Sequence, residues 1–176
     1  MRNVLTALLT TGALLGAAGS ASAATATATF QVSATVAKNC TVSATNLGFG
    51  TYTQGAGAVN ATSTVTVGCT HKTGYTVALN GGTTALGTVA QRLMTDGVAG
   101  DPTLQYNLYT TVADATVWGD GTGSSVTQAG TGAGVLTPTN FTVFGNLPDN
   151  ANNQTANTSG ALGTTYTDTI TVTVTY

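Results

Sequence analysis

Charged side chains are scarce in this chain of 176 residues. It contains no Glu, six Asp and four Lys or Arg residues, so only 6% of its residues are charged, whereas a typical soluble domain has about 25%. Stable helices favour Ala, Leu, Glu, Lys, Gln and Arg, so the composition argues against a coiled coil or a helical bundle. Four basic residues and a pI of 4.7 also exclude the positive surface that nucleic-acid binding needs.

Side chains that perform catalysis or bind metals are few as well. His71 is the only His and stands in the predicted turn 69–74, which argues against a nucleophile paired with a histidine base. The stretch Asp120–Gly123 lacks both the Gly-Lys-Thr of a phosphate-binding loop and the acidic ligands of a calcium loop. Most Asp residues adjoin Gly, Pro or Asn and are typical of turns rather than of a catalytic carboxylate pair. We expect no catalytic residue, no cofactor and no metal site.

What the chain has in abundance is Thr and Gly. Thr fills 40 positions and Gly 23. Thr, Val, Tyr and Ile favour strands, whereas Gly and Asn favour turns. A positive mean hydropathy of +0.20 with a net charge of −2 argues against disorder. The composition therefore predicts an all-β domain.

The first 23 residues read as a secretory signal peptide. Arg2 is followed by a mostly apolar run from Val4 to Ala18 and by the small residues of 21–23, a pattern that export signals share. We expect cleavage after Ala23. The run is too short and too rich in Thr and Gly for a comfortable membrane span, and no later segment is apolar enough to cross a membrane.

The two cysteines fit an exported protein. Cys40 and Cys69 are the only pair, and in an oxidising compartment we expect them to form a disulfide. Closing a loop of this size contributes about 3–4 kcal/mol in the chain-entropy description. Free thiols and a zinc site are the less favoured alternatives, because His71 alone cannot complete a set of four ligands.

Residues 24–36 alternate strictly between small or apolar residues and Thr, Ser or Gln. The even positions hold Ala24, Ala26, Ala28, Phe30, Val32, Ala34 and Val36. A period of two over 13 residues predicts an extended strand with one apolar face. This length exceeds the usual strand of about 5–6 residues.

Short strands separated by turns are predicted along the rest of the chain. The last of them, 169–176, places Ile170, Val172, Val174 and Tyr176 on one face, and 119–134 and 149–163 are predicted to be loops. The pattern favours a sandwich. The other predicted strands are 59–69, 75–79, 104–108 and 141–144.

Both ends of the predicted mature chain are thus alternating strands of low charge. Natural proteins normally protect such edges with Lys, Pro or inward-facing charges. Neither terminal strand has that protection, and we interpret this as a sign that edge pairing with another chain is the purpose.

In order and spacing, the motifs of the chain resemble the spore coat protein U domain family. That family includes the pilins of archaic, Csu-type chaperone–usher fimbriae. The resemblance covers nearly all of 24–176. It rests on Phe30-x-Val32-x-Ala34-x-Val36-x3-Cys40, Leu47-x-Phe49-Gly50-x-Tyr52, Val65-x-Val67-x-Cys69-Thr70, Tyr75-x-Val77-x-Leu79-x2-Gly82, Arg92-x-Met94, Leu104-x-Tyr106-x-Leu108-Tyr109, Trp118-Gly119-Asp120-Gly121, Phe144-Gly145 and Tyr166-x-Asp168-Thr169-x3-Thr173-Val174-x-Tyr176.

The resemblance implies an incomplete immunoglobulin-like sandwich over 37–176 that is completed by donor-strand exchange. A periplasmic chaperone would first lend a strand, and residues 24–36 of the next subunit would replace it at an outer-membrane usher. Ala28, Phe30, Val32 and Ala34 would anchor that donor segment, and Ile170, Val172, Val174 and Tyr176 would line the receiving strand. Backbone pairing with side chains in alternate pockets is the general physics of such strand addition. The product would be an extracellular, cell-surface fimbrium that supports adhesion and biofilm formation.

Two other readings remain open. A secreted spore-coat or surface-coat protein could share the same fold. A small carbohydrate-binding module could use Trp118 together with the 119–134 loop, although a lone Trp beside a strand is more often part of the core. An exported hydrolase is disfavoured by the scarcity of catalytic groups. Among pilins we expect a repeated shaft subunit, because a tip subunit needs a receptor-binding domain in addition.

Overall fold

The computed structural model of the chain describes residues 23–112, 115–156 and 164–176. Nearly all of the predicted signal peptide, and the part of the 149–163 loop that falls in 157–163, lie outside the described residues. The chain divides into two units, one up to Thr35 and one over Val36–Tyr176. Each is described by itself.

In the first unit, residues 23–35 form no strand and their side chains are exposed. Phe30 is 87% and Val32 is 82% exposed. The alternation of this segment predicts an extended strand, yet a strand is defined by hydrogen bonds to a neighbour. An alternating pattern therefore marks a segment that is able to pair without supplying its partner.

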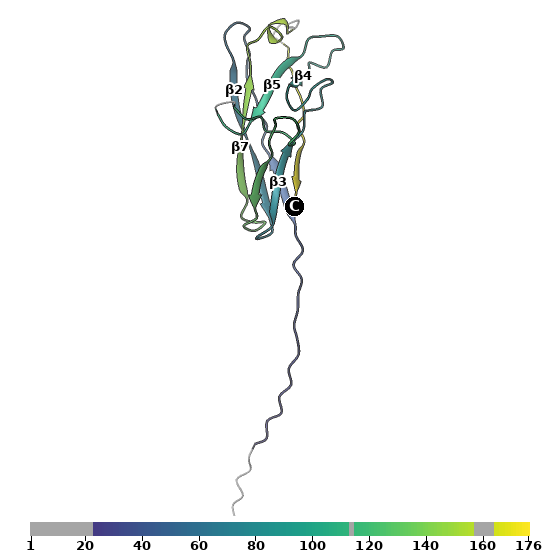
Figure 1. Cartoon of the computed structure of the whole chain (residues 1–176), viewed down its shortest axis with the longest axis vertical. Helices are drawn as coiled ribbons and strands as arrows, with labels where there is room; N and C mark the ends of the chain where they lie inside the picture. The colour runs from purple at the N-terminus through teal and green to yellow at the C-terminus, as the bar shows by residue number, and fades with distance from the viewer. Residues whose placement is uncertain (1–22, 113–114, 157–163) are drawn as a thin grey trace, which may run out of the picture. The chain divides into compact units, whose positions relative to one another are not determined.

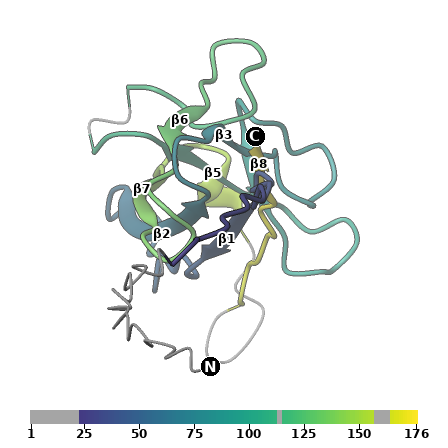
Figure 2. The ribbon, with the colours of Figure 1, turned by 90° about the horizontal axis from the view of Figure 1, so that it is seen from below.

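The second unit is built from two antiparallel sheets (Figure 1). The five-stranded sheet has the order β1-β2-β7-β5-β4, and the three-stranded sheet has the order β6-β3-β8. Figure 2 shows the two sheets from below. The strands are β1 (Cys40–Ala44), β2 (Val59–Cys69), β3 (Gly74–Leu79), β4 (Arg92–Met94), β5 (Leu104–Tyr109), β6 (Gln128–Thr131), β7 (Thr139–Leu147) and β8 (Val172–Thr175).

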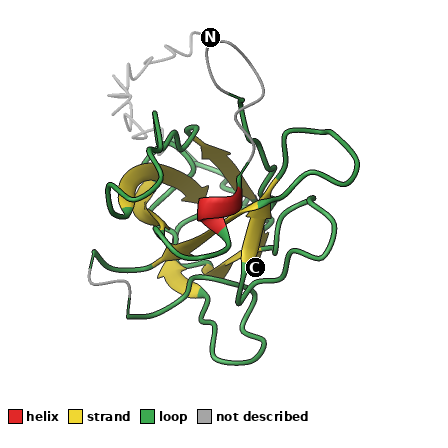
Figure 3. Ribbon diagram, turned by 90° about the horizontal axis from the view of Figure 1, so that it is seen from above, coloured by secondary structure: helices red, strands yellow, loops and turns green. Residues whose placement is uncertain are grey.

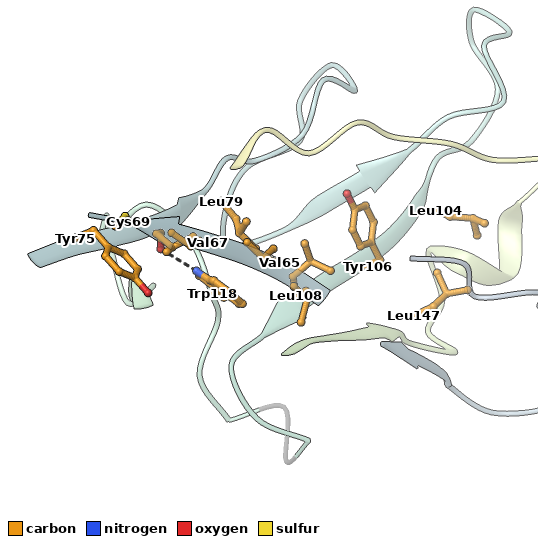
Figure 4. Packing of buried hydrophobic residues seen from close by; sticks show 12 residues of the cluster. Val65, Val67, Cys69, Tyr75, Leu79, Leu104, Tyr106, Leu108, Trp118 and Leu147 are labelled. Carbon is orange, nitrogen blue, oxygen red and sulfur yellow. Dashed lines mark hydrogen bonds between the residues drawn. The ribbon is translucent and has the colours of Figure 1, made fainter. Parts of the chain in front are cut away.

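The core lies between the two sheets. Alternate residues of β2 and β3 point into it, among them Val65, Val67, Val77 and Leu79, which are at most 2% exposed. Side chains from β5 and β7 complete the same cluster (Figure 4). This is the sandwich logic of one buried face on each sheet, and it confirms the all-β prediction.

Most predicted strands occur, and the corrections concern the least patterned segments. The predicted loop 119–134 contains strand β6, which pairs with β3. Its sequence Gln-Ala-Gly-Thr has no apolar alternation. A Cβ at Gly130 would lie 2.4 Å from the Tyr75 ring, so a larger residue does not fit there. The predicted strand 169–176 is regular only over Val172–Thr175. The predicted loop 149–163 contains the 3-10 helix Asn153–Thr155, drawn in red in Figure 3.

The disulfide joins Cys40 to Cys69, the pair that the sequence predicts, with an S–S distance of 2.05 Å. These residues also face each other in the β1–β2 ladder, so the cross-link fixes the start of β1 against the end of β2. His71 lies exposed in the turn that follows. The described residues contain no cluster of three or more His, Cys, Asp or Glu side chains suited to a metal ion. They also contain no helix long and apolar enough to cross a membrane.

Candidate binding groove

Strands β1 and β8 each end a sheet and have one unpaired edge. Among the described strands β1 pairs only with β2, and β8 pairs only with β3. Both backbone groups of Thr171 bond to Asn80, and both of Thr167 bond to Thr95. The direction of the backbone N–H and C=O groups alternates along a strand. The backbone groups of Ile170, Val172 and Val174 therefore face the other way, toward the unpaired edge.

The two edges lie beside each other without pairing. Cα atoms of β1 and β8 approach within 8 Å, and the two strands lie close together in the view from below (Figure 2). Hydrogen-bonded strands are spaced about 4.8 Å apart, so a strand inserted between them needs a gap of about twice that. Insertion at this end would therefore widen the gap between β1 and β8.

A cavity of about 610 Å³ opens where the two edges diverge. One wall is the segment 44–47 with Phe49, and the other is 166–170 with Val172. Its floor is the sandwich interior, formed by Val65, Leu79, Met94, Tyr106, Leu108 and Val143. Apolar core side chains thus face an open groove instead of a covering strand.

The inward-facing side chains along the two groove edges are only partly covered. Cys40, Val42 and Ala44 share the inward face by alternation, yet Val42 is 45% exposed and Ala44 is exposed as well. On the opposite edge Ile170, Val172 and Val174 are half-buried. Burying such side chains contributes about 1.5–3 kcal/mol each. Burial of these side chains would therefore stabilise the binding of a segment that covers the groove.

One polar pair lines this apolar groove. The hydroxyl of Tyr106 donates to Oδ2 of Asp168 over 2.6 Å, and Oδ1 accepts the backbone N–H of Thr83 at 2.8 Å and of Thr84 at 3.1 Å. Burial alone would raise the pKa of Asp168, but these hydrogen bonds outweigh it and lower the pKa. Burial and the neighbouring carboxylate together raise the pKa of Tyr106. The carboxylate thus stays ionised and ties the segment before β8 to the loop after β3.

Behind the groove, Arg92 holds several chain segments together. Its side chain is fully buried and donates to Oδ1 of Asn107 at 2.6 Å, to the backbone oxygen of Trp118 at 2.8 Å and to that of Asn80 at 2.9 Å. Burial lowers the pKa of the guanidinium. Carbonyl oxygens satisfy its donors, which indicates a structural role for this cation.

A second carboxylate fastens the loops at the far end of the domain. Asp149 accepts hydrogen bonds from the Tyr52 hydroxyl at 2.6 Å and from the N–H of Gly57 at 2.9 Å. These bonds, that of Tyr52 first, lower the pKa of Asp149 to about 2. Burial and the bond to Asp149 raise the pKa of Tyr52 to about 12. This network connects 52–57 to 149–154 and does not line the groove.

The structure brings together some of the residues predicted for the site and leaves others apart. Ile170 and Val172 line the cavity, whereas Val174 and Tyr176 lie beyond its end. The predicted donor anchors Ala28, Phe30, Val32 and Ala34 are exposed. The Tyr106–Asp168 pair and the wall residue Phe49 were not predicted as site residues, although all three stand in the motifs of the family resemblance.

Trp118 belongs to the core. It is 0% exposed, and its indole N–H donates to the backbone oxygen of Val77 at 3.0 Å (Figure 4). A ring in this position cannot stack on a sugar without unfolding the sheet. The carbohydrate-binding hypothesis depended on Trp118 as the stacking residue, and this buried ring is not accessible to a sugar.

The fold and the groove define a class: a β-sandwich with an uncovered apolar groove between two sheet edges. Comparison with known proteins supplies the family. The sequence pattern of the Spore Coat Protein U domain matches residues 26–173, which is most of the chain. The chain belongs to this family, as its motifs indicate.

Among solved structures, the chain is similar to one from the archaic chaperone–usher Csu pili of Acinetobacter baumannii. The match is to a chain in the crystal structure of the CsuC–CsuE chaperone–tip adhesion subunit pre-assembly complex. It has a TM-score of 0.52 and 26% sequence identity, and it covers 81% of this chain and 40% of that one. The chain thus spans less than half the length of its structural relative. No curated protein matches the sequence.

Proposed function

We propose that this protein is a structural subunit of an extracellular chaperone–usher pilus. Copies polymerise head to tail, each inserting residues 24–36 into the groove of its neighbour. The observation that supports this most directly is that one chain has both halves of a contact. It has an open apolar groove with unpaired strand edges and an exposed alternating segment that forms no strand of its own.

The dimensions of the two halves agree. About 12 residues at roughly 3.3 Å each span the height of a sandwich, and residues 24–36 supply that number. A contact between two different surfaces of the same molecule repeats without closing and generates an open filament. The work of such a subunit is assembly, and it requires neither a catalytic residue nor a cofactor.

Export and assembly then follow the route of the related complex. In this proposal residues 1–23 direct the chain to the periplasm and are removed after Ala23. A periplasmic chaperone covers the groove until an outer-membrane usher exchanges it for the donor segment of the next copy. The support for a chaperone is the similarity to the CsuC–CsuE pre-assembly complex. The filament serves adhesion and biofilm formation at the cell surface.

The test is to separate the donor segment from the groove by mutation in the native cell. Phe30→Asp places a charge on the largest apolar side chain of the segment, and we expect loss of the heat-resistant ladders that pilins give on gels without boiling. Gln31→Asp, on the other face of the same segment, is the matched control and should leave the ladders intact. Undiminished ladders from Phe30→Asp would remove this residue as an anchor.

Deletion of 24–36 tests the proposal as a whole. The shortened subunit should still bind the chaperone, because its groove is unchanged, but it should form no filaments visible by electron microscopy. Membership of the Spore Coat Protein U domain family supports a second candidate, a secreted coat protein. Deleting the usher distinguishes the two, since a pilus disappears with its usher and a coat does not.

A further inference from the structure

The groove has a wide part and a narrow part, and the boundary between them is defined by the strand registers. Ala44 faces Val65, and Leu79 faces Val172, and all four residues line the cavity. Two residues further along each ladder, toward the end of the domain that holds Tyr176, lie the pairs Val42–Val67 and Val77–Val174. None of these four residues lines the cavity. Space for large donor side chains therefore exists only from Val172 back to Tyr166.

The direction of an inserted strand follows from where the chain enters the domain. Strand β2 ends at Cys69, opposite Cys40, and a short turn leads to β3, whose start lies near the end of β8. Cys40 and the C-terminus are therefore at the same end of the domain. A donor antiparallel to β8 leaves the groove at the opposite end, so the donor's own domain does not collide with the segment that precedes Cys40.

Parity and size then select one register. Residues directly opposite on antiparallel strands share a face, so even donor positions lie opposite even positions of 166–176. The inward residues Phe30, Val32, Ala34 and Val36 match the four cavity positions 172, 170, 168 and 166. Ala28 then lies opposite Val174, beyond the end of the cavity, where a small side chain is required.

The Tyr106–Asp168 pair distinguishes this register from those shifted by two residues. Tyr106 on the groove floor and Asp168 on its wall lie at one level. A bulky residue of the donor segment there would displace a carboxylate that the N–H and hydroxyl groups of Thr83 and Thr84 also hold. Among the four residues of the donor segment that would face the cavity, Ala34 is the only small one. A shift of two residues would place either Val32 against this pair or Phe30 at Val174, where the cavity has ended.

We infer that the donor segment of a second copy lies antiparallel to β8 with Phe30 opposite Val172 and Ala34 opposite Asp168, and that the Tyr106–Asp168 pair selects this register. The inference rests on the proposed function and adds to it the residue-by-residue pairing. It makes Tyr106 and Asp168 residues that determine specificity, because they admit only a small donor side chain at one level.

Disulfide trapping of assembled filaments tests the register. Gln31 and Thr171 lie opposite each other in the inferred pairing, and the backbone of Thr171 faces β3, so they form a non-hydrogen-bonded pair. The Cα atoms of such pairs are about 4.5 Å apart, within the range that a disulfide spans. Diagonal neighbours lie about 7–8 Å apart, beyond easy reach. The side chains at 169, 171 and 173 are exposed.

The variants combine Gln31→Cys with Thr169→Cys, Thr171→Cys or Thr173→Cys in the native cell, and the single variants serve as controls. We expect the 31/171 variant to give ladders that survive boiling without reductant, and the other two to give about a tenth as much, in line with their separation. Ladders mainly from 31/169 or 31/173, or from none of the three in assembled filaments, overturn the register while the pilus proposal stands. A cross-linked monomer, or a wild-type chain that never polymerises, overturns both.

A size test addresses the polar pair. Ala34→Leu should lower the yield of filaments by about tenfold or more, because overpacking is poorly tolerated in a filled groove. Ala26→Leu is the matched control, since position 26 falls opposite the exposed Tyr176, and its filament yield should stay within about twofold. Equal yields from the two variants overturn the role of the Tyr106–Asp168 pair.

Discussion

The interior around Trp118 and the groove between β1 and β8 are two parts of one sandwich, yet they differ in how their apolar side chains are covered. Around Trp118 the indole N–H and the guanidinium of Arg92 both find backbone acceptors, and both side chains are fully buried. At the groove, Val42 and the residues before β8 remain partly exposed above an apolar floor.

The difference does not come from a shortage of apolar residues. Phe30, Val32 and Val36, which precede strand β1, are at least 80% exposed. The chain therefore has side chains suited to a cover and leaves them free. One chain thus combines an uncovered groove with an exposed alternating segment, so this domain folds without covering all of its apolar surface.

The largest effect on stability is expected from a substitution in the covered interior around Trp118. Trp118→Ala should lower the free energy of unfolding by about 3–5 kcal/mol, as truncation of a buried aromatic does. Urea unfolding of the isolated subunit measures this. Phe30→Ala is the control and should change the same quantity by less than about 0.5 kcal/mol. Equal losses from both would show that the two regions do not differ.

Removing the disulfide loosens one edge of the groove. The variant with Cys40→Ser and Cys69→Ser should lose about 3–4 kcal/mol of unfolding free energy, because the open loop regains its entropy. Intact mass with and without reductant first checks that the bond exists in the exported protein. Reduced wild-type subunit should then match the double variant in urea. Two reactive thiols in native material would refute the cross-link.

A charge on the groove wall sharpens the comparison. Val172→Asp places a carboxylate on the half-buried inward face and should cost about 1–3 kcal/mol, which lowers the amount of subunit that accumulates in the periplasm. Thr173→Asp, the exposed neighbour on the same strand, should stay within about 0.5 kcal/mol. Immunoblots of periplasmic extracts report both. Normal accumulation of Val172→Asp would argue that this face is not part of the core.

The smallest effect is expected far from the groove, at Asp149. Its folded-state pKa of about 2 lies below the ordinary value of 3.8, so its ionised form stabilises the fold above about pH 4. That contribution is lost as the pH falls through about 2. Asp149→Asn should therefore have a lower melting temperature than the wild type at pH 7, and the gap should narrow between pH 4 and pH 2. A gap that is independent of pH would exclude this carboxylate as its source.

Local patterns predicted much of the fold because they report which face of a strand is buried. The alternation in 59–69 became strand β2, and Val65, Val67 and Cys69 face the core as expected. The pattern fails where pairing depends on a distant partner. Strand β6 has no apolar period of its own. It pairs with β3, and the ring of Tyr75 on that strand packs over Gly130.

The site divides in the same way. The apolar faces of 24–36 and of 170–174 can be read from the sequence, because side-chain direction alternates with a period of two wherever a chain is extended. The meeting of Tyr106 with Asp168, 62 residues apart, cannot be read from either residue, because it requires β5 to lie beside the segment before β8.

By itself, the sequence determined that the chain is all-β, that Cys40 and Cys69 are its only possible disulfide, and that the segments 24–36 and 169–176 alternate without protection against pairing. These features depend on composition and on neighbouring residues. The tertiary structure alone decided that Trp118 is core, that β1 and β8 do not pair, and that an apolar cavity opens between their edges. The physical reason is that burial and unpaired edges are properties of segments far apart in the chain, and only folding brings those segments together.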